Sequence, residues 1–175
     1  SVVERASERL HPDPPTLAMP PVRAGYSGRE LARFPGTIRV RTRVVADLVY
    51  DVVHSLTDMG FEKIVVVNGH GHHPAILEMV ARETADDSGA YIAVMDAAKL
   101  AARAVAEHRK SAPGGCIHGG EFETSLMLYL DQPVEMDEAT DEDTFVFDSP
   151  FFPRDGFAGS KKAFWSTWGI QVSKT

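Results

Sequence analysis

Hydrophobic residues recur along the chain with two different periods, which predict helices that alternate with short strands. Over residues 41–59, valines and leucines repeat at spacings of three and four, as on the buried face of a helix. Residues 64–67 form a continuous β-branched run, which is typical of a strand buried on both faces of a parallel sheet. A second central strand is expected over residues 91–95. Further helices are expected over residues 2–10, 75–86 and 97–107, and brief strands over residues 16–19 and 38–40.

This order of elements predicts an α/β fold with three layers (α/β/α), in which helices cover both faces of a mostly parallel sheet. A length of 175 residues suits a single domain, residues 1–175. The segment 131–175 differs in composition, because acidic residues concentrate over 135–143 and aromatic residues over 145–168. The acidic part is expected to be a solvated surface. The aromatic part suits either a tail packed on its own core or an arm that packs on a neighbouring subunit or covers a pocket.

Charge and composition exclude several classes of protein. The formal net charge of −7 argues against a nucleic-acid surface, which needs a basic patch. No apolar run approaches the roughly 20 residues of a membrane span, so no membrane partner is expected. The single cysteine, Cys116, excludes an internal disulfide and fits a reducing, cytoplasmic compartment. Without a surrounding motif, it is expected to be a small buried filler more than a nucleophile.

Three imidazoles follow the predicted strand at 64–67. His70 lies inside the sequence Asn68-Gly69-His70-Gly71, which has the composition of a tight turn, and His72 and His73 come directly after it. In α/β folds, functional side chains collect at the carboxyl ends of the strands. Imidazole is also a common ligand for zinc and related metals. The turn is therefore a candidate metal or catalytic site.

A second cluster of polar residues begins at His118, which is followed by two glycines, Glu121 and Glu123. Carboxylates in the first turn of the helix expected here are stabilised by the helix dipole whatever their function, which explains one of the two glutamates. A histidine and a carboxylate next to a glycine turn also suit a metal ligand and a proton-transfer group. The residues of the helix expected to face the core are Phe122, Leu126, Met127 and Leu130.

The two clusters together resemble the motifs of the creatininase (creatinine amidohydrolase) family. The resemblance rests on Asn68-Gly69-His70-Gly71 after a hydrophobic strand and on the stretch 118–125. The segments 25–27 and 34–37 are similar to family segments in the same order, so the likeness covers most of residues 1–130. It implies a three-layer α/β/α fold, two divalent metals at the carboxyl ends of the strands, and hydrolysis of an amide-type C–N bond in a small substrate. It also implies a homohexamer.

By position, the resemblance implies a role for several residues. His70 matches a metal ligand, Glu121 matches an acidic residue that can serve the second metal, and His118 matches a histidine that takes part in catalysis. Glu123 is expected to support the ligands or to cap the helix. The metal could be zinc, manganese, iron or cobalt. Candidates for substrate contacts are Tyr26, Ser27 and His72, although a plain surface turn explains the first two equally well.

The chain also departs from the family pattern. His72 stands where creatininase has a metal-binding glutamate, so it could bind metal, contact substrate or do neither. Gly114 stands where creatininase has a tryptophan, which argues against creatinine itself as the substrate. The family's first metal motif would precede residue 1 and its last helices would follow residue 175. The domain is therefore expected to be incomplete at both ends and, if this is the whole polypeptide, to bind metal weakly. Two alternatives stay open: a hydrolase that opens the ring of a cyclic ketone, as in inositol-type catabolism, and a non-catalytic or maturation subunit of the same fold.

Overall fold

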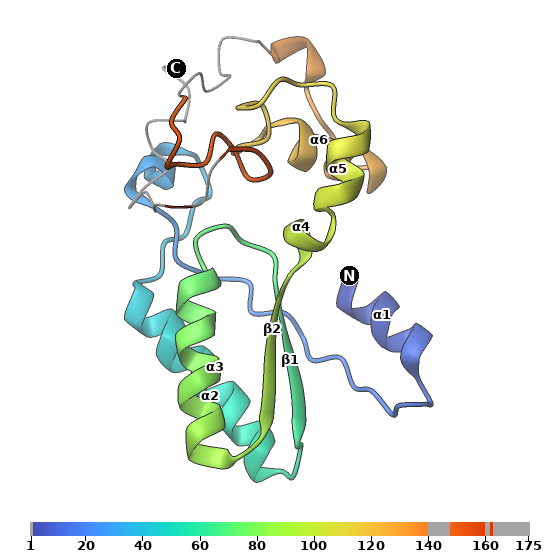
Figure 1. Cartoon of the computed structure of the whole chain (residues 1–175), viewed down its shortest axis with the longest axis vertical. Coiled ribbons are helices and arrows are strands. Elements are labelled where there is room, and N and C mark those ends of the chain that lie inside the picture. Colours follow the sequence, from blue (N-terminus) through green and yellow to red (C-terminus); the bar gives the residue numbers. More distant parts are fainter. Residues whose placement is uncertain (1, 140–147, 160–161, 163–175) are drawn as a thin grey trace.

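The computed structural model describes residues 2–139, 148–159 and 162, and its elements follow the predicted alternation of helix and strand (Figure 1). The secondary-structure elements, in chain order, are α1 (Val2–Leu10), the 3-10 helix η1 (Arg29–Arg33), α2 (Thr42–Asp58), β1 (Lys63–Asn68), α3 (Pro74–Ser88), β2 (Tyr91–Asp96), α4 (Ala97–Leu100), α5 (Ala102–His108), α6 (Glu121–Tyr129) and the 3-10 helix η2 (Met136–Glu138). None of the helices in the described residues has the length and hydrophobicity of a membrane span.

The centre of the fold is a β-α-β unit made of β1, α3 and β2. The two strands pair in parallel, from Lys63 opposite Tyr91 to Asn68 opposite Asp96. Pro74 begins α3, where a missing backbone N–H costs nothing, and Gly89 ends it with a φ of 72°. This unit confirms the predicted α/β fold with a parallel sheet. It also brings the residues that follow β1 and β2 to one edge of the sheet.

Helices α2 and α3 pack together and contribute the buried core (Figure 1). The core cluster consists of Val45, Ala46, Ile76 and Val80. Along both strands, half-buried residues alternate with exposed ones. Val65 is 55% exposed and Tyr91 is 77% exposed, so the prediction that β1 is buried on both faces is wrong for the described residues. The physical reason is that no described helix covers this face, and α1 buries none of its residues.

Three other predicted elements differ from the observed ones. Residues 16–19 form no strand, because they pair with no other segment in the described part of the chain. Around residue 39 there is a single parallel bridge between Gly25 and Arg39 in place of a strand. The helix expected over 97–107 is divided at Ala101, whose ψ of −5° ends α4 before α5 begins.

Helix α6 forms where it was expected, but its apolar residues do not face a core. Leu126, Met127 and Leu130 are 45%, 43% and 56% exposed, so the prediction that they are buried is wrong within the described residues. Phe122 makes the expected kind of contact, since its ring lies 4.9 Å from the ring of Phe157 in a T-shaped arrangement. Helical periodicity locates an apolar face, but burial also needs an element that covers it.

The described part of the C-terminal segment, residues 148–159, turns back onto the loop that precedes α6. The backbone N–H of Gly156 donates to the carbonyl of Cys116 at 3.2 Å, and Phe157 packs on Phe122. In the described residues, this segment therefore packs on the chain's own loop. The described part of the predicted acidic stretch, residues 135–139, is exposed, as expected for a solvated surface; residues 140–143 of that stretch, and residues 145–147, 160, 161 and 163–168 of the aromatic stretch, lie outside the described residues.

Candidate functional site

Asn68 organises the turn that carries the histidines. It is only 3% exposed, its side-chain oxygen accepts from the N–H of His70 at 3.1 Å, and its side-chain nitrogen donates to the carbonyl of His70 at 2.9 Å. The same nitrogen donates to Asp96 at 3.3 Å. Asp96 in turn accepts from the N–H groups of Ala98 and Lys99 at the start of α4. Asn68 therefore holds the histidine turn against the end of the neighbouring strand.

The Asn68→Ala substitution is expected to lower the free energy of unfolding by about 2 kcal/mol, because a buried amide and its hydrogen bonds are lost. Chemical denaturation followed by circular dichroism measures this. The Gln132→Ala variant, which removes an exposed amide, is the control and is expected to stay within about 0.5 kcal/mol of wild type. Equal stability of the Asn68→Ala and Gln132→Ala proteins would show that Asn68 does not hold the turn.

Four imidazoles come together beside this turn. The ring centroids of His70 and His73 are 4.7 Å apart, those of His70 and His72 are 5.2 Å apart, and those of His72 and His118 are 5.7 Å apart. The Nε2 atoms of His72 and His118 are both buried. The structure thus brings His118, from the loop before α6, into one cluster with His70, and His72 lies between them.

The backbone of residues 26–28 binds three of these imidazoles. The N–H of Tyr26 donates to Nε2 of His73 at 2.9 Å, and Nε2 of His70 contacts the carbonyl oxygen of Tyr26 at 2.9 Å. The N–H of Gly28 donates to Nδ1 of His72 at 3.3 Å. A carbonyl only accepts, so the proton lies on Nε2 of His70, whereas Nε2 of His73 and Nδ1 of His72 carry none. These contacts place the Tyr26 ring 5.8 Å from that of His72.

His73, whose role the sequence left open, is a half-buried acceptor. Burial first, and then the neighbouring His70, hold the pKa of His73 below its ordinary value of 6.5. A neutral ring is what acceptance of the Tyr26 N–H requires. The same ring fills the space beside Gly25, where a Cβ would lie 2.6 Å from Nε2 of His73. Gly25 therefore allows the segment to approach the histidine turn.

The Gly25→Ala substitution is expected to displace the His73 ring, break its bond to Tyr26 and lower stability by about 2 kcal/mol. The matched control is Gly71→Ala, because a Cβ at Gly71 meets no atom within 4 Å. Urea denaturation of both variants checks the prediction. It is wrong if the two alanine variants lose the same amount of stability.

The two glutamates near the start of α6 turn toward backbone N–H groups. The carboxylate of Glu121 accepts from the N–H groups of Lys110 and Ser111, both at 2.7 Å. Hydrogen bonds from Ser111 and Lys110 lower the pKa of Glu121 below its ordinary value of 4.5. Glu123 accepts from the N–H of Gly119 at 2.6 Å, which fits the expected role at the end of the helix. Glu121 thus holds the preceding loop, a contact that its position in the sequence did not indicate.

The histidine nitrogens and glutamate oxygens of the described residues are of the types that bind zinc or manganese, but they are not arranged around one ion. Within residues 2–139, 148–159 and 162, no three histidine, cysteine, aspartate or glutamate side chains are placed to hold one ion. His70 and Glu121 direct nitrogen and oxygen atoms at backbone groups. The described residues alone therefore do not form the two-metal site that the resemblance implies.

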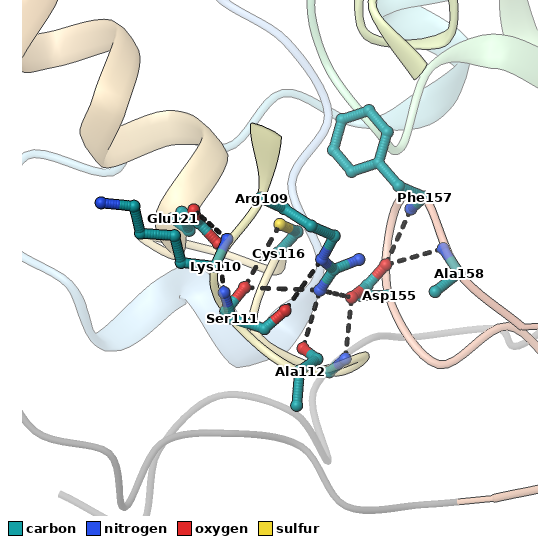
Figure 2. Close-up of polar contacts among 10 residues, drawn as sticks. Arg109, Lys110, Ser111, Ala112, Cys116, Glu121, Asp155, Phe157 and Ala158 are labelled. Atoms are coloured by element: carbon teal, nitrogen blue, oxygen red, sulfur yellow. Dashed lines mark hydrogen bonds and ion pairs between the residues drawn. The ribbon is translucent and has the colours of Figure 1, made fainter. Parts of the chain in front are cut away.

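Sequence reasoning missed a buried ion pair between Arg109 and Asp155, at the loop that precedes α6 and carries His118 (Figure 2). The Asp155 side chain is 0% exposed, and its Oδ2 accepts from Nη2 of Arg109 at 2.9 Å and from the N–H of Gly114 at 2.7 Å. Its Oδ1 accepts from the N–H groups of Phe157 and Ala158, both at 2.8 Å. Burial raises the pKa of Asp155, but the Arg109 guanidinium and these N–H groups outweigh it and hold the pKa below the ordinary 3.8.

Cys116 lies in the same loop and is 5% exposed, so the prediction of a buried filler is confirmed. Its sulfur lies 3.8 Å from Oγ of Ser111. No sequence signal pointed to Arg109 or Asp155. An arginine after a short helix and an aspartate among aromatic residues have no motif, and the two are 46 residues apart.

Comparison with known proteins places the chain in a family. Residues 1–169 match the creatininase family, which is described as creatinine amidohydrolase. This chain belongs to the creatininase family. A creatinine amidohydrolase from Pseudomonas putida is 28% identical over 185 residues, and the alignment covers 93% of this chain and 70% of that relative. No solved structure gave a significant match. The match to the creatininase family confirms the resemblance found in the sequence motifs.

Proposed function

We propose that this protein is a hydrolase that cleaves the amide-type C–N bond of a small cyclic or amide substrate. The observation that carries the proposal is the cluster in which His118 meets the histidine turn after β1, with His72 and His118 at 5.7 Å, in a chain of the creatininase family. The relative from Pseudomonas putida is named for amide hydrolysis, which supports this class of reaction. Clustered imidazoles at the carboxyl end of a strand also suit amide hydrolysis, because imidazole transfers protons near neutral pH.

In the proposed reaction, His118 carries the proton. Water attacks the carbonyl carbon and forms a C–O bond, the C–N bond breaks, and the proton that water loses passes through the imidazole to the leaving nitrogen. Histidine suits this task because its ordinary pKa lies near neutrality, so the ring both accepts and releases a proton. The burial of Nε2 of His118 keeps bulk water from competing for that proton.

We place the substrate beside Tyr26, in an open cavity of about 370 Å3 that also borders residues 39–42. Tyr26 belongs to both the cavity and the imidazole cluster, since its ring lies 5.8 Å from that of His72. In this proposal, Tyr26, Ser27 and His72 contact the substrate. Ser27 is fixed by its carbonyl, which accepts from Nε of Arg39 at 3.0 Å. Arg39 and Arg41 line the same cavity, and arginine side chains suit a polar substrate.

Metal binding is a separate part of the proposal. The family resemblance supports two divalent metals, with His70 and Glu121 among the ligands. Both side chains would then exchange their present backbone contacts for the metals, and other residues would supply the remaining ligands. The family resemblance likewise supports a homohexamer, which light scattering of the purified protein tests.

The deciding experiment is a hydrolysis assay on a panel that contains creatinine, a cyclic urea, a formamide and a cyclic ketone, each with zinc, manganese, iron or cobalt added. Hydrolysis of an amide-type member, with a new carboxylate and a freed nitrogen group, is the expected result. Opening of the cyclic ketone alone would favour C–C hydrolysis. Absence of any turnover with every metal would favour a non-catalytic subunit and contradict the proposal.

A further inference from the structure

The loop of residues 109–120, called here the His118 loop, connects α5 to α6 and carries His118. It contains no helix or strand, and side chains from outside the loop accept hydrogen bonds from three of its backbone N–H groups. At one end, the Glu121 carboxylate accepts from the N–H groups of Lys110 and Ser111. Near its middle, Asp155 accepts from the N–H of Gly114. Two carboxylates therefore determine the path of the chain toward His118.

Arg109 links Asp155 to further backbone groups of the loop (Figure 2). While its Nη2 donates to Asp155, the same nitrogen donates to the carbonyl of Ala112 at 2.7 Å, and its Nε donates to the carbonyl of Ser111 at 3.0 Å. The guanidinium thus ties two loop carbonyls to a carboxylate from a segment far along the chain. A lysine could not make these contacts together, because its ammonium is a single point of donation.

Residues next to Asp155 continue the contact toward His118. The N–H of Gly156 donates to the carbonyl of Cys116 at 3.2 Å, two residues before His118. Phe157 packs on Phe122, in the first turn of α6, at 4.9 Å between ring centroids. The segment that carries Asp155 therefore contacts the chain on both sides of His118.

We propose that Asp155, acting through Arg109, is a positioning residue that sets the His118 imidazole against His72. This inference rests on the proposed proton-transfer role of His118. A proton-transfer group works only within hydrogen-bond reach of the reacting atom, and a misplacement of about 1 Å can cost on the order of 100-fold in rate. Neither residue needs to touch the substrate for this effect.

The test combines the Asp155→Asn protein with a readout that reports the His118 ring itself. Histidine-labelled protein is followed by NMR, and each ring signal is assigned by single His→Gln variants. In Asp155→Asn, the amide nitrogen must face two donors, either Gly114 N–H and Arg109 or the N–H groups of Phe157 and Ala158, so one of these two pairs of contacts is lost. The His118 ring signals are expected to shift, while those of His54 on α2 stay unchanged. For any panel substrate that is hydrolysed, kcat should fall about 10- to 100-fold with KM within twofold.

The matched control is Asp148→Asn, the same chemical change on a side chain that is 81% exposed in the same segment, and it should leave every signal unchanged. Arg109→Lys is the second variant and should move the same His118 signals. An unshifted His118 signal in a folded Asp155→Asn protein overturns the proposal. Loss of all histidine signals in both variants also overturns it, because the pair would then hold the whole fold. If wild type hydrolyses no substrate, the proposed function fails, yet the NMR result still decides whether Asp155 positions this ring.

Discussion

Replacement of His118 by glutamine is expected to lower kcat for amide hydrolysis by about 100- to 10,000-fold, the range that a positioned acid–base group contributes. Glutamine has a similar size and hydrogen-bonding capacity, but its amide neither gains nor loses a net proton near neutral pH. The ring it replaces lies 5.7 Å from that of His72, with its Nε2 buried. Substrate contacts elsewhere in the site remain, so KM should change by less than about threefold.

Steady-state kinetics on the substrate that wild type hydrolyses best provides the measurement. The matched control is His54→Gln, which makes the same change on the surface of α2, where the side chain is 34% exposed and pairs with Asp58. Metal content, determined by elemental analysis of both variants, separates loss of proton transfer from loss of metal. A His118→Gln protein that retains more than about a third of wild-type kcat would remove His118 from the reaction.

The Asp155→Asn substitution is expected to lower the free energy of unfolding by about 3 kcal/mol, because the loss of one partner of a buried ion pair leaves the other charge uncompensated. The Arg109 side chain is 14% exposed and the Asp155 side chain 0%, so water can replace little of the interaction that the Arg109 charge loses. Urea denaturation measures the change, with Asp148→Asn as the exposed control. A loss below about 1 kcal/mol would mean that the pair stabilises the loop little.

The same pair predicts how stability depends on pH. The folded-state pKa of Asp155 lies below its ordinary value of 3.8, so between the two values the unfolded chain binds more protons than the folded one. The contribution of Asp155 is therefore complete above the ordinary value, and it is lost as pH falls through the folded value. Wild type should lose stability on acidification below about pH 4 more steeply than Asp155→Asn. Parallel pH profiles for the two proteins would contradict this.

Local sequence was sufficient to predict the strand and the turn that carry the histidines. The β-branched run predicted β1, and Asn68-Gly69-His70-Gly71 predicted a turn with functional side chains at the end of a strand. The family motifs then pointed to His70 and His118 as members of one site, and the structure places both in one imidazole cluster. Their chemical roles stay predictions until the variants are measured.

Local sequence did not predict the contacts that Glu121 and Tyr26 make. Position in the motif indicated a metal ligand at Glu121, whereas the carboxylate accepts from Lys110 and Ser111 in the structure. Its sequence position makes Tyr26 a candidate for substrate contact, yet its backbone N–H and carbonyl contact His73 and His70. Backbone groups are present at every residue, so no sequence pattern marks the ones that bind a distant side chain.

The sequence by itself determined the local elements and the family, because helical and strand periods are set by the backbone and the motif residues are neighbours in the chain. It predicted α2, α3 and both strands of the parallel pair. Only the tertiary structure decided which faces are covered, as the exposed residues of α6 show. It also decided that Asp155 reaches Arg109 across 46 residues, because such a contact depends on how the intervening chain folds back.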